Sequence, residues 1–152
     1  MKLKSKNIKT VKRLSYVVFV VYIVVLVYFL FFSEKYGRVA SDEYHYNLVP
    51  FTEIKRYFLY FDRIGFAGFM LNIVGNVVAF IPFGMFLPLL QPFHRKAIVA
   101  VADGLLFTVC IETIQLVTKV GSFDVDDIIL NTLGALCGYV VFILANRIVK
   151  KK

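Results

Sequence analysis

The sequence predicts an all-α, polytopic membrane protein with four transmembrane helices. Of its 152 residues, 59% are hydrophobic and 16% are aromatic, and the mean hydropathy is +0.74. This is more apolar surface than a soluble domain of this length can bury. A membrane span requires roughly 20 apolar residues. Four segments meet this requirement, namely Leu14–Phe32, Phe66–Leu90, Ala97–Thr118 and Val125–Ala145.

The basic residues predict how these spans are oriented. The net charge is +8, and the Lys and Arg residues cluster before the first span, between the second and third, and after the fourth. Basic residues gather on the cytoplasmic side of membrane proteins, so we expect both termini to be cytoplasmic. Basic span ends also bind anionic head groups, which favours membrane lipids over nucleic acid as partners.

The first apolar run raises the question of a signal peptide. The run is longer than the apolar region of a usual signal peptide, and no small-residue cleavage site follows it closely, so we expect an uncleaved anchor. The predicted organisation is a basic cytoplasmic N-terminus (1–13), a transmembrane anchor (14–32), an extracytoplasmic loop (33–65), a three-helix core (66–146) and a basic cytoplasmic tail (147–152).

The extracytoplasmic loop contains a helical pattern after a proline. Pro50 keeps the preceding residue out of helical geometry, and Phe51, Ile54, Phe58 and Phe61 then recur at helical spacing. The pattern predicts a short amphipathic helix. It fits a helix lying on the outer leaflet, and it fits equally a helix that packs on the end of the bundle.

The fourth span carries a polar stripe that gives way to small residues. Asp124, Asp127 and Asn131 lie at positions i, i+3 and i+7, and Gly134 and Gly138 continue the same helical face. Polar atoms that face lipid lack hydrogen-bond partners. We therefore expect this face to turn toward other helices, with the glycines allowing close packing.

The second and third spans carry polar residues at a matching depth, in the outer half of the membrane. Polar and ionisable groups are costly there, so they point to function. The sequence therefore predicts one polar site, with no assigned metal or cofactor, made of Asn47, Asn72, Asn76, Glu112, Gln115, Asp124, Asp127 and Asn131.

Capping and packing offer a second explanation for part of this set. Ser122 or Asp124 suits the N-cap of the fourth span, and Asp126 and Asp127 suit its first turn because the helix dipole favours acids there. Amides in spans also join helices by hydrogen bonds. Capping does not account for Glu112, so we favour a polar site, in which clustered acids would have raised pKa values or bind a cation.

Three further expectations concern the cytoplasmic half. Pro82 should kink the second span because proline lacks an amide donor, and Pro88 should end it. Asp103 lies near the cytoplasmic end, where we expect an ion pair with Arg95, Lys96 or a C-terminal basic residue.

Four motifs in order resemble those of the VanZ-like family. They are Asn47-Leu48-Val49-Pro50-Phe51, the stretch from Asn72 through Asn76 to Phe80-Ile81-Pro82-Phe83-Gly84, Glu112-x-x-Gln115, and the stretch from Phe123-Asp124-Val125-Asp126-Asp127 to Asn131-Thr132-Leu133-Gly134-Ala135. The resemblance covers about Tyr46 to Gly138. Many members of that family carry an arginine just before the acidic motif, where this chain has Gly121-Ser122.

The resemblance implies a multi-pass protein of the bacterial plasma membrane that contributes to resistance to glycopeptide and lipoglycopeptide antibiotics such as teicoplanin. Two classes of function remain open. The protein binds an amphiphile at an outer-leaflet polar site, with a cell-wall lipid precursor or a lipoglycopeptide as candidate partners. Alternatively, Glu112 and an aspartate perform acid–base or metal-assisted hydrolysis or transfer on a lipid-linked substrate. Since no nucleophile elbow, Ser-His-Asp arrangement or phosphate-binding loop is present, we favour binding.

Overall fold

The four predicted spans are all helices in the computed structural model, which describes residues 5–32 and 42–151. The elements follow the order α1 (Ser5–Phe31), β1 (His45–Asn47), α2 (Thr52–Leu59), α3 (Phe61–Phe69), η2 (Met70–Val74), α4 (Gly75–Leu90), η3 (Pro92–Arg95), α5 (Ala97–Thr118), β2 (Ser122–Asp124) and α6 (Val125–Lys151). The stretches long and apolar enough to cross a membrane are Thr10–Phe31, Phe61–Leu90, Ala97–Thr118 and Val125–Ile148. The chain is therefore an all-α, multi-pass membrane protein.

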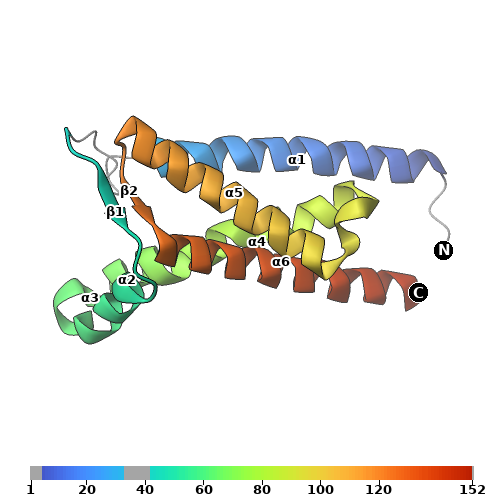
Figure 1. Ribbon diagram of the computed structural model, residues 1–152. Helices are drawn as coiled ribbons and strands as arrows, with labels where there is room; N and C mark the ends of the chain where they lie inside the picture. Colours follow the sequence, from blue (N-terminus) through green and yellow to red (C-terminus); the bar gives the residue numbers. More distant parts are fainter. Residues whose placement is uncertain (1–4, 33–41, 152) are drawn as a thin grey trace.

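The two ends of the helix bundle differ in structure. The start of α1 and the end of α6 lie together at one end, which we call the terminal end (Figure 1). The two short strands and helices α2 and α3 lie at the opposite end, which we call the strand end. The polar residues predicted in the outer half of the membrane belong to the half of the bundle nearest the strand end.

Helices α4 and α6 pack closely because three glycines lie where they cross. A methyl group added at Gly84, Gly134 or Gly138 would lie 1.8, 2.1 or 1.9 Å from a backbone carbonyl oxygen of the facing helix. No side chain fits at these distances, so the two backbones are in direct contact. This confirms the close packing that Gly134 and Gly138 predict.

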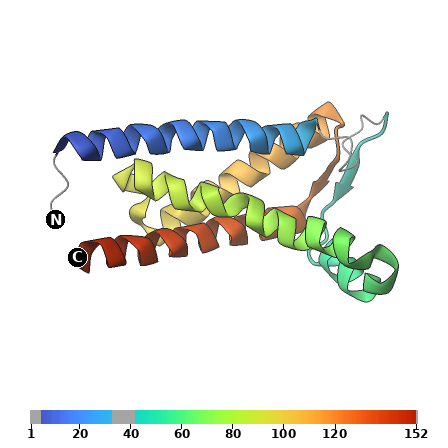
Figure 2. The ribbon, with the colours of Figure 1, turned by 180° about the vertical axis from the view of Figure 1, so that it is seen from behind.

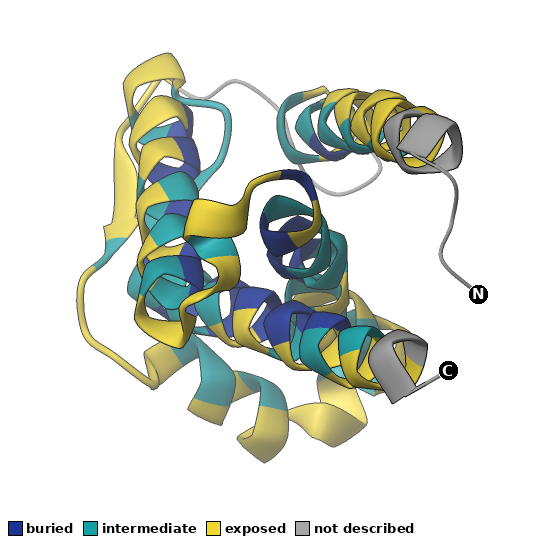
Figure 3. Cartoon of the chain, turned by 90° about the vertical axis from the view of Figure 1, so that its right-hand side faces the viewer, coloured by how far each residue is buried: buried dark blue, intermediate teal, exposed yellow. Residues whose placement is uncertain are grey.

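The buried residues gather where α4, α5 and α6 face one another (Figure 3). Phe83 of α4 stacks on Phe107 of α5, with ring centroids 4.5 Å apart and ring planes 2° from parallel. Phe80, which is 1% exposed, packs beside both rings. The three helices thus form the core of the bundle.

Helix α1 is attached to this core more loosely and remains largely exposed (Figures 2 and 3). Phe19 lies beside aromatic rings of α4. Further along, the Tyr22 hydroxyl donates a hydrogen bond to the Ala79 carbonyl at 2.8 Å. Toward the strand end, the Gln115 amide of α5 donates to the Leu30 carbonyl at 3.0 Å. Leu26 is 6% exposed and packs with Phe80 and Ile111. The opposite side of α1 carries exposed valines and aromatic residues, as expected for a surface against lipid.

Local details differ from the expectations in two places. Helix α4 continues through Pro82 and Pro88 and ends at Leu90, so Pro88 does not end it. Asp103 pairs with His94, so the expected lysine or arginine partner was wrong. The 3₁₀ turn η3 explains this, because it directs the Arg95 Nε back to the Pro88 carbonyl, 3.1 Å away.

Enlarging a glycine at the α4–α6 crossing should destabilise the bundle. We expect Gly138→Ala to lower the Tm of the purified protein, since its methyl group meets backbone and overpacking costs about 1–3 kcal/mol. Gly75→Ala is the matched control, because its methyl group would lie 3.4 Å from the nearest atom. An unchanged Tm for Gly138→Ala would contradict the close crossing.

Candidate functional site

Two three-residue parallel strands join distant parts of the chain at the strand end. His45 pairs with Ser122, and Asn47 pairs with Asp124. The sequence analysis did not predict these strands, because three residues are too few to show an alternating pattern. The pairing places the segment before α2 against the start of α6.

Asp124 caps the start of α6. Its Oδ1 accepts hydrogen bonds from the Asp126 amide at 2.8 Å and from the Asn47 side chain at 3.0 Å. The Asp124 amide in turn donates to the Glu112 carboxylate of α5 at 3.0 Å. The N-cap expected at Asp124 is confirmed, and Glu112 is buried directly beneath it.

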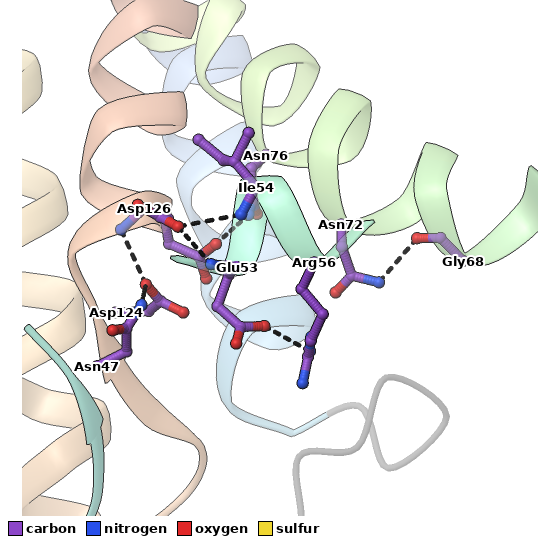
Figure 4. Close-up of polar contacts among 10 residues, drawn as sticks. Asn47, Glu53, Ile54, Arg56, Gly68, Asn72, Asn76, Asp124 and Asp126 are labelled. Carbon is purple, nitrogen blue, oxygen red and sulfur yellow. Dashed lines mark hydrogen bonds and ion pairs between the residues drawn. The ribbon is translucent and has the colours of Figure 1, made fainter. Parts of the chain in front are cut away.

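Asp126 holds the start of α2, although it belongs to the first turn of α6. Its carboxylate accepts hydrogen bonds from the backbone amides of Phe51 at 2.5 Å, Glu53 at 2.7 Å and Ile54 at 3.0 Å. Figure 4 shows Asp126 facing Glu53 and Ile54. The first amides of a helix have no partner within the helix, and a carboxylate there is also favoured by the helix dipole. Asp126 is 1% exposed and fastens α2 to the end of the bundle.

Phe51 has an unusual backbone conformation at this junction. Its φ is 66°, in the left-handed region that a bulky residue rarely adopts. This conformation accompanies the contact between the Phe51 amide and Asp126. Surrounding contacts are needed to hold a bulky residue in this conformation, and the hydrogen bond to Asp126 is one of them.

A polar cavity of about 170 Å³ lies among α2, η2, β2 and the start of α6. We call it the polar cavity. Its lining residues are Glu53, Ile54, Arg56, Tyr57, Asn72, Ile73, Ser122, Asp124, Asp126, Asp127 and Leu130. Four of these are carboxylates and one is a guanidinium. The guanidinium of Arg56 forms an ion pair with Glu53, one turn earlier on α2 (Figure 4).

Burial and neighbouring negative charges raise the pKa values of Asp124 and Glu53. Burial raises the pKa of Asp124 above its usual range, and the neighbouring Asp126 charge raises it further, against the hydrogen bonds that the carboxylate accepts. Burial also raises the pKa of Glu53, although the Arg56 charge lowers it. Both shifts arise mainly because burial removes the carboxylates from water, which disfavours their charged form.

A larger, mostly apolar groove of about 620 Å³ lies beside the polar cavity, between α1 and α4. We call it the apolar groove. It is lined by Tyr22, Val25, Leu26, Phe29, Leu30, Leu71, Asn72, Gly75, Asn76, Val78, Ala79, Pro82 and Asp127. Asn72 and Asp127 line both spaces. The Asn76 side chain donates to the Asp127 carboxylate at 2.6 Å, at the polar end of the groove.

Comparison with known proteins supports the family resemblance of the four sequence motifs. The sequence model of VanZ/LLP1 matches residues 19–146, which include both cavities. The chain belongs to the VanZ/LLP1 family. Protein VanZ of Enterococcus faecium is 28% identical to it over 125 residues, which are 80% of this chain and 68% of that protein. No solved structure gave a significant match.

The residues predicted for the site fall into two groups in this VanZ-family structure. Asn72, Asp124 and Asp127 line the polar cavity, and Asn76 joins them through Asp127. Asn47 lies at the edge of this group, bonded to Asp124.

The remaining three predicted residues connect elements and do not line the two cavities. Glu112 binds the Asp124 amide, and Gln115 binds α1. The Asn131 amide of α6 donates to the Thr108 hydroxyl of α5 at 2.9 Å, while its Oδ1 has no hydrogen-bond partner within the described residues. All three side chains are at most 2% exposed.

Five polar residues that line the polar cavity were not predicted as site residues, namely Glu53, Arg56, Tyr57, Ser122 and Asp126. Glu53 and Arg56 lie on the polar side of the amphipathic pattern in α2, and that pattern was the signal that could have identified them. From the sequence, Asp126 was interpreted as an acid that is favoured by the dipole of its own helix, α6. Its contacts with α2 span 72 to 75 positions, so no local pattern reveals them.

The polar cavity is best suited to a ligand that donates hydrogen bonds or carries positive charge. Ionised carboxylates are acceptors only, and they outnumber the lining cations by four to one. Within the described residues, no group of three or more His, Cys, Asp or Glu side chains is arranged to hold a metal ion.

Removing the Asp126 carboxylate should release α2. We expect Asp126→Ala to increase trypsin cleavage after Lys55 and Arg56 at least about tenfold, since hydrogen bonds to charged groups contribute about 1.5–3 kcal/mol each. The measurement is limited proteolysis of purified protein followed by mass spectrometry. Asp62→Ala, at an exposed acid of α3, is the control. Equal cleavage rates in Asp126→Ala and wild type would contradict this role.

Proposed function

We propose that this protein is an envelope factor that contributes to glycopeptide and lipoglycopeptide resistance by binding an amphiphile. VanZ-family membership relates the chain to teicoplanin resistance. The observation that carries the binding proposal is the pair of adjoining spaces, one acidic and one apolar, that share Asn72 and Asp127. A molecule with a polar head and an apolar tail matches both spaces at once.

We further propose that the strand end faces the outside of a bacterial plasma membrane. The terminal end carries basic residues from three parts of the chain, including Lys12, Arg13, Arg95, Lys96 and Arg147. Their distribution follows the positive-inside pattern, which supports cytoplasmic termini. In this orientation the polar cavity lies in the outer leaflet, where a cell-wall lipid precursor or a lipoglycopeptide would be encountered.

Binding at this position would alter antibiotic access without covalent chemistry. An amphiphile held between α1 and α4 is removed from the surrounding leaflet, and its head group is covered by α2. A lipoglycopeptide held in this way would be kept from its target, and a bound precursor would present its head group differently. Both routes depend on occupation of the same site.

The first test is antibiotic protection in a susceptible bacterium that expresses the chain. We expect Asp127→Asn to lower the minimum inhibitory concentration of teicoplanin, because it removes charge while keeping an acceptor for Asn76. Val78→Trp should have a similar effect by filling the apolar groove. Since both act on one site, the double variant should lose little more than either single variant.

The control for this test is a substitution outside both cavities. Leu106→Trp, at an exposed position of α5, should leave protection unchanged at equal membrane abundance. Full protection by Asp127→Asn would contradict the proposal. Time-dependent conversion of a lipid-linked precursor by purified wild-type protein, abolished in Glu112→Gln, would replace binding with the hydrolase or transferase alternative.

Cysteine labelling tests the orientation. In a background with Cys110 and Cys137 replaced by alanine, Lys55→Cys should react with a membrane-impermeant maleimide in intact cells. Lys96→Cys should react only after the cells are permeabilised. Both lysines are exposed, so accessibility depends on the side of the membrane. The opposite labelling pattern would reverse the proposed topology.

A further inference from the structure

We infer that the bound amphiphile is a membrane-resident lipid with a protonated amine in its head group and one hydrocarbon chain in the apolar groove. This inference rests on the proposed binding function and names the class of ligand. It depends on the charge of the polar cavity and on the apolar walls, the length and the opening of the apolar groove.

The charge of the polar cavity selects the head group. Of the described residues that line it, Arg56 is the one cation, and it is already paired with Glu53. Asp124 and Asp126 accept hydrogen bonds from amide groups, which carry no net charge. An ammonium group would supply both positive charge and three donors. Electrostatic attraction is stronger beside a protein than in bulk water because the effective dielectric constant is lower there.

The apolar groove is suited to a hydrocarbon chain. Its walls are formed by side chains such as Val25, Leu26 and Phe29 on α1 and by Val78 and Pro82 on α4. Its volume of about 620 Å³ is within the usual range of ligand cavities. The Tyr22 hydroxyl, which is the polar group at the inner end, is already bonded to the Ala79 carbonyl. The walls are therefore apolar in the part away from Asp127.

The length of the groove matches one leaflet of a membrane. The wall from Asn72 to Pro82 covers ten helical steps, or about 15 Å. The hydrocarbon core of a bilayer is about 30 Å thick. A chain whose head group lies beside Asp127 would therefore extend roughly to the middle of the membrane. This is the position of an acyl chain in a bilayer lipid.

The groove opens sideways from the bundle. Val25 and Phe29 are each 46% exposed, and Val78 is 53% exposed. Its apolar walls come from α1, α4 and Leu71 of η2, and of the described residues of α6 only Asp127 lines it, at the polar end. The exposed side of a membrane-spanning bundle faces lipid, so the occupant enters from the hydrocarbon layer. This supports a bilayer lipid as the source.

Photo-crosslinking in reconstituted vesicles tests the inference. The probes are a 16-carbon alkyl amine with a diazirine in the chain and the alcohol with the same chain, each added to phosphatidylcholine vesicles that contain the full-length protein. After illumination, mass spectrometry locates the labelled peptides. We expect the amine to label residues 22–30 and 71–82 about fivefold more than the alcohol does, as a charge-assisted contact requires.

Variants separate the roles of the two cavities. Asp127→Asn should remove the preference for the amine, while Val78→Trp should lower groove labelling by both probes. Leu106→Trp should behave as wild type. Equal labelling by amine and alcohol, or labelling spread evenly over all lipid-facing helices, would overturn the inference.

The crosslinking experiment and the antibiotic-protection experiment can fail independently of each other. Loss of amine preference in Asp127→Asn, with teicoplanin protection intact, would support the ligand class and reject its link to resistance. If Asp127→Asn lost teicoplanin protection but the wild-type protein showed no preference for the amine, the ligand class would be rejected and the binding proposal would remain.

Discussion

The contact between the Asp126 carboxylate and three backbone amides at the start of α2 determines the architecture of the strand end. It brings α2 beside η2 and the start of α6, and so helps to form the polar cavity from elements that are far apart in the sequence. The strand pair reinforces this junction, because Asn47 binds the Asp124 side chain that caps α6. The Asp126 contact thus helps to fix the positions of Glu53, Arg56 and Tyr57 beside the acids of α6.

The other buried polar groups follow from the same constraint, since a polar atom inside a membrane protein requires an internal partner. Glu112, Gln115 and Asn131 each bind another element and so join the helices of the bundle. Asp127 differs because it lines both the polar cavity and the apolar groove. Under the binding proposal, this distinction separates residues that maintain the bundle from those that would contact a ligand. It also explains why the acids of one sequence motif have different roles.

Much of the fold could be predicted because its signals are local. Apolar length identified the four spans, helical spacing identified the small-residue face of α6, and Asp124 had the residue type and position of an N-cap. The contacts of Asp126 and the two short strands could not be predicted in this way, because their partners lie more than 70 positions away. The placement of Gln115 was missed for a related reason. Its helical face was clear from the sequence, but the carbonyl it binds belongs to α1.

Amide hydrogen exchange of the wild-type protein tests the central claim, that a carboxylate of α6 holds the start of α2. The amides of Glu53 and Ile54 lie in the first turn of α2 and have no carbonyl partner within that helix. Their protection therefore depends on Asp126. Exchange measured by mass spectrometry on overlapping peptides should show these two amides protected to the same extent as the amides in the middle of α2. Exchange at the rate of an unstructured peptide, with the middle of α2 still protected, would contradict the account.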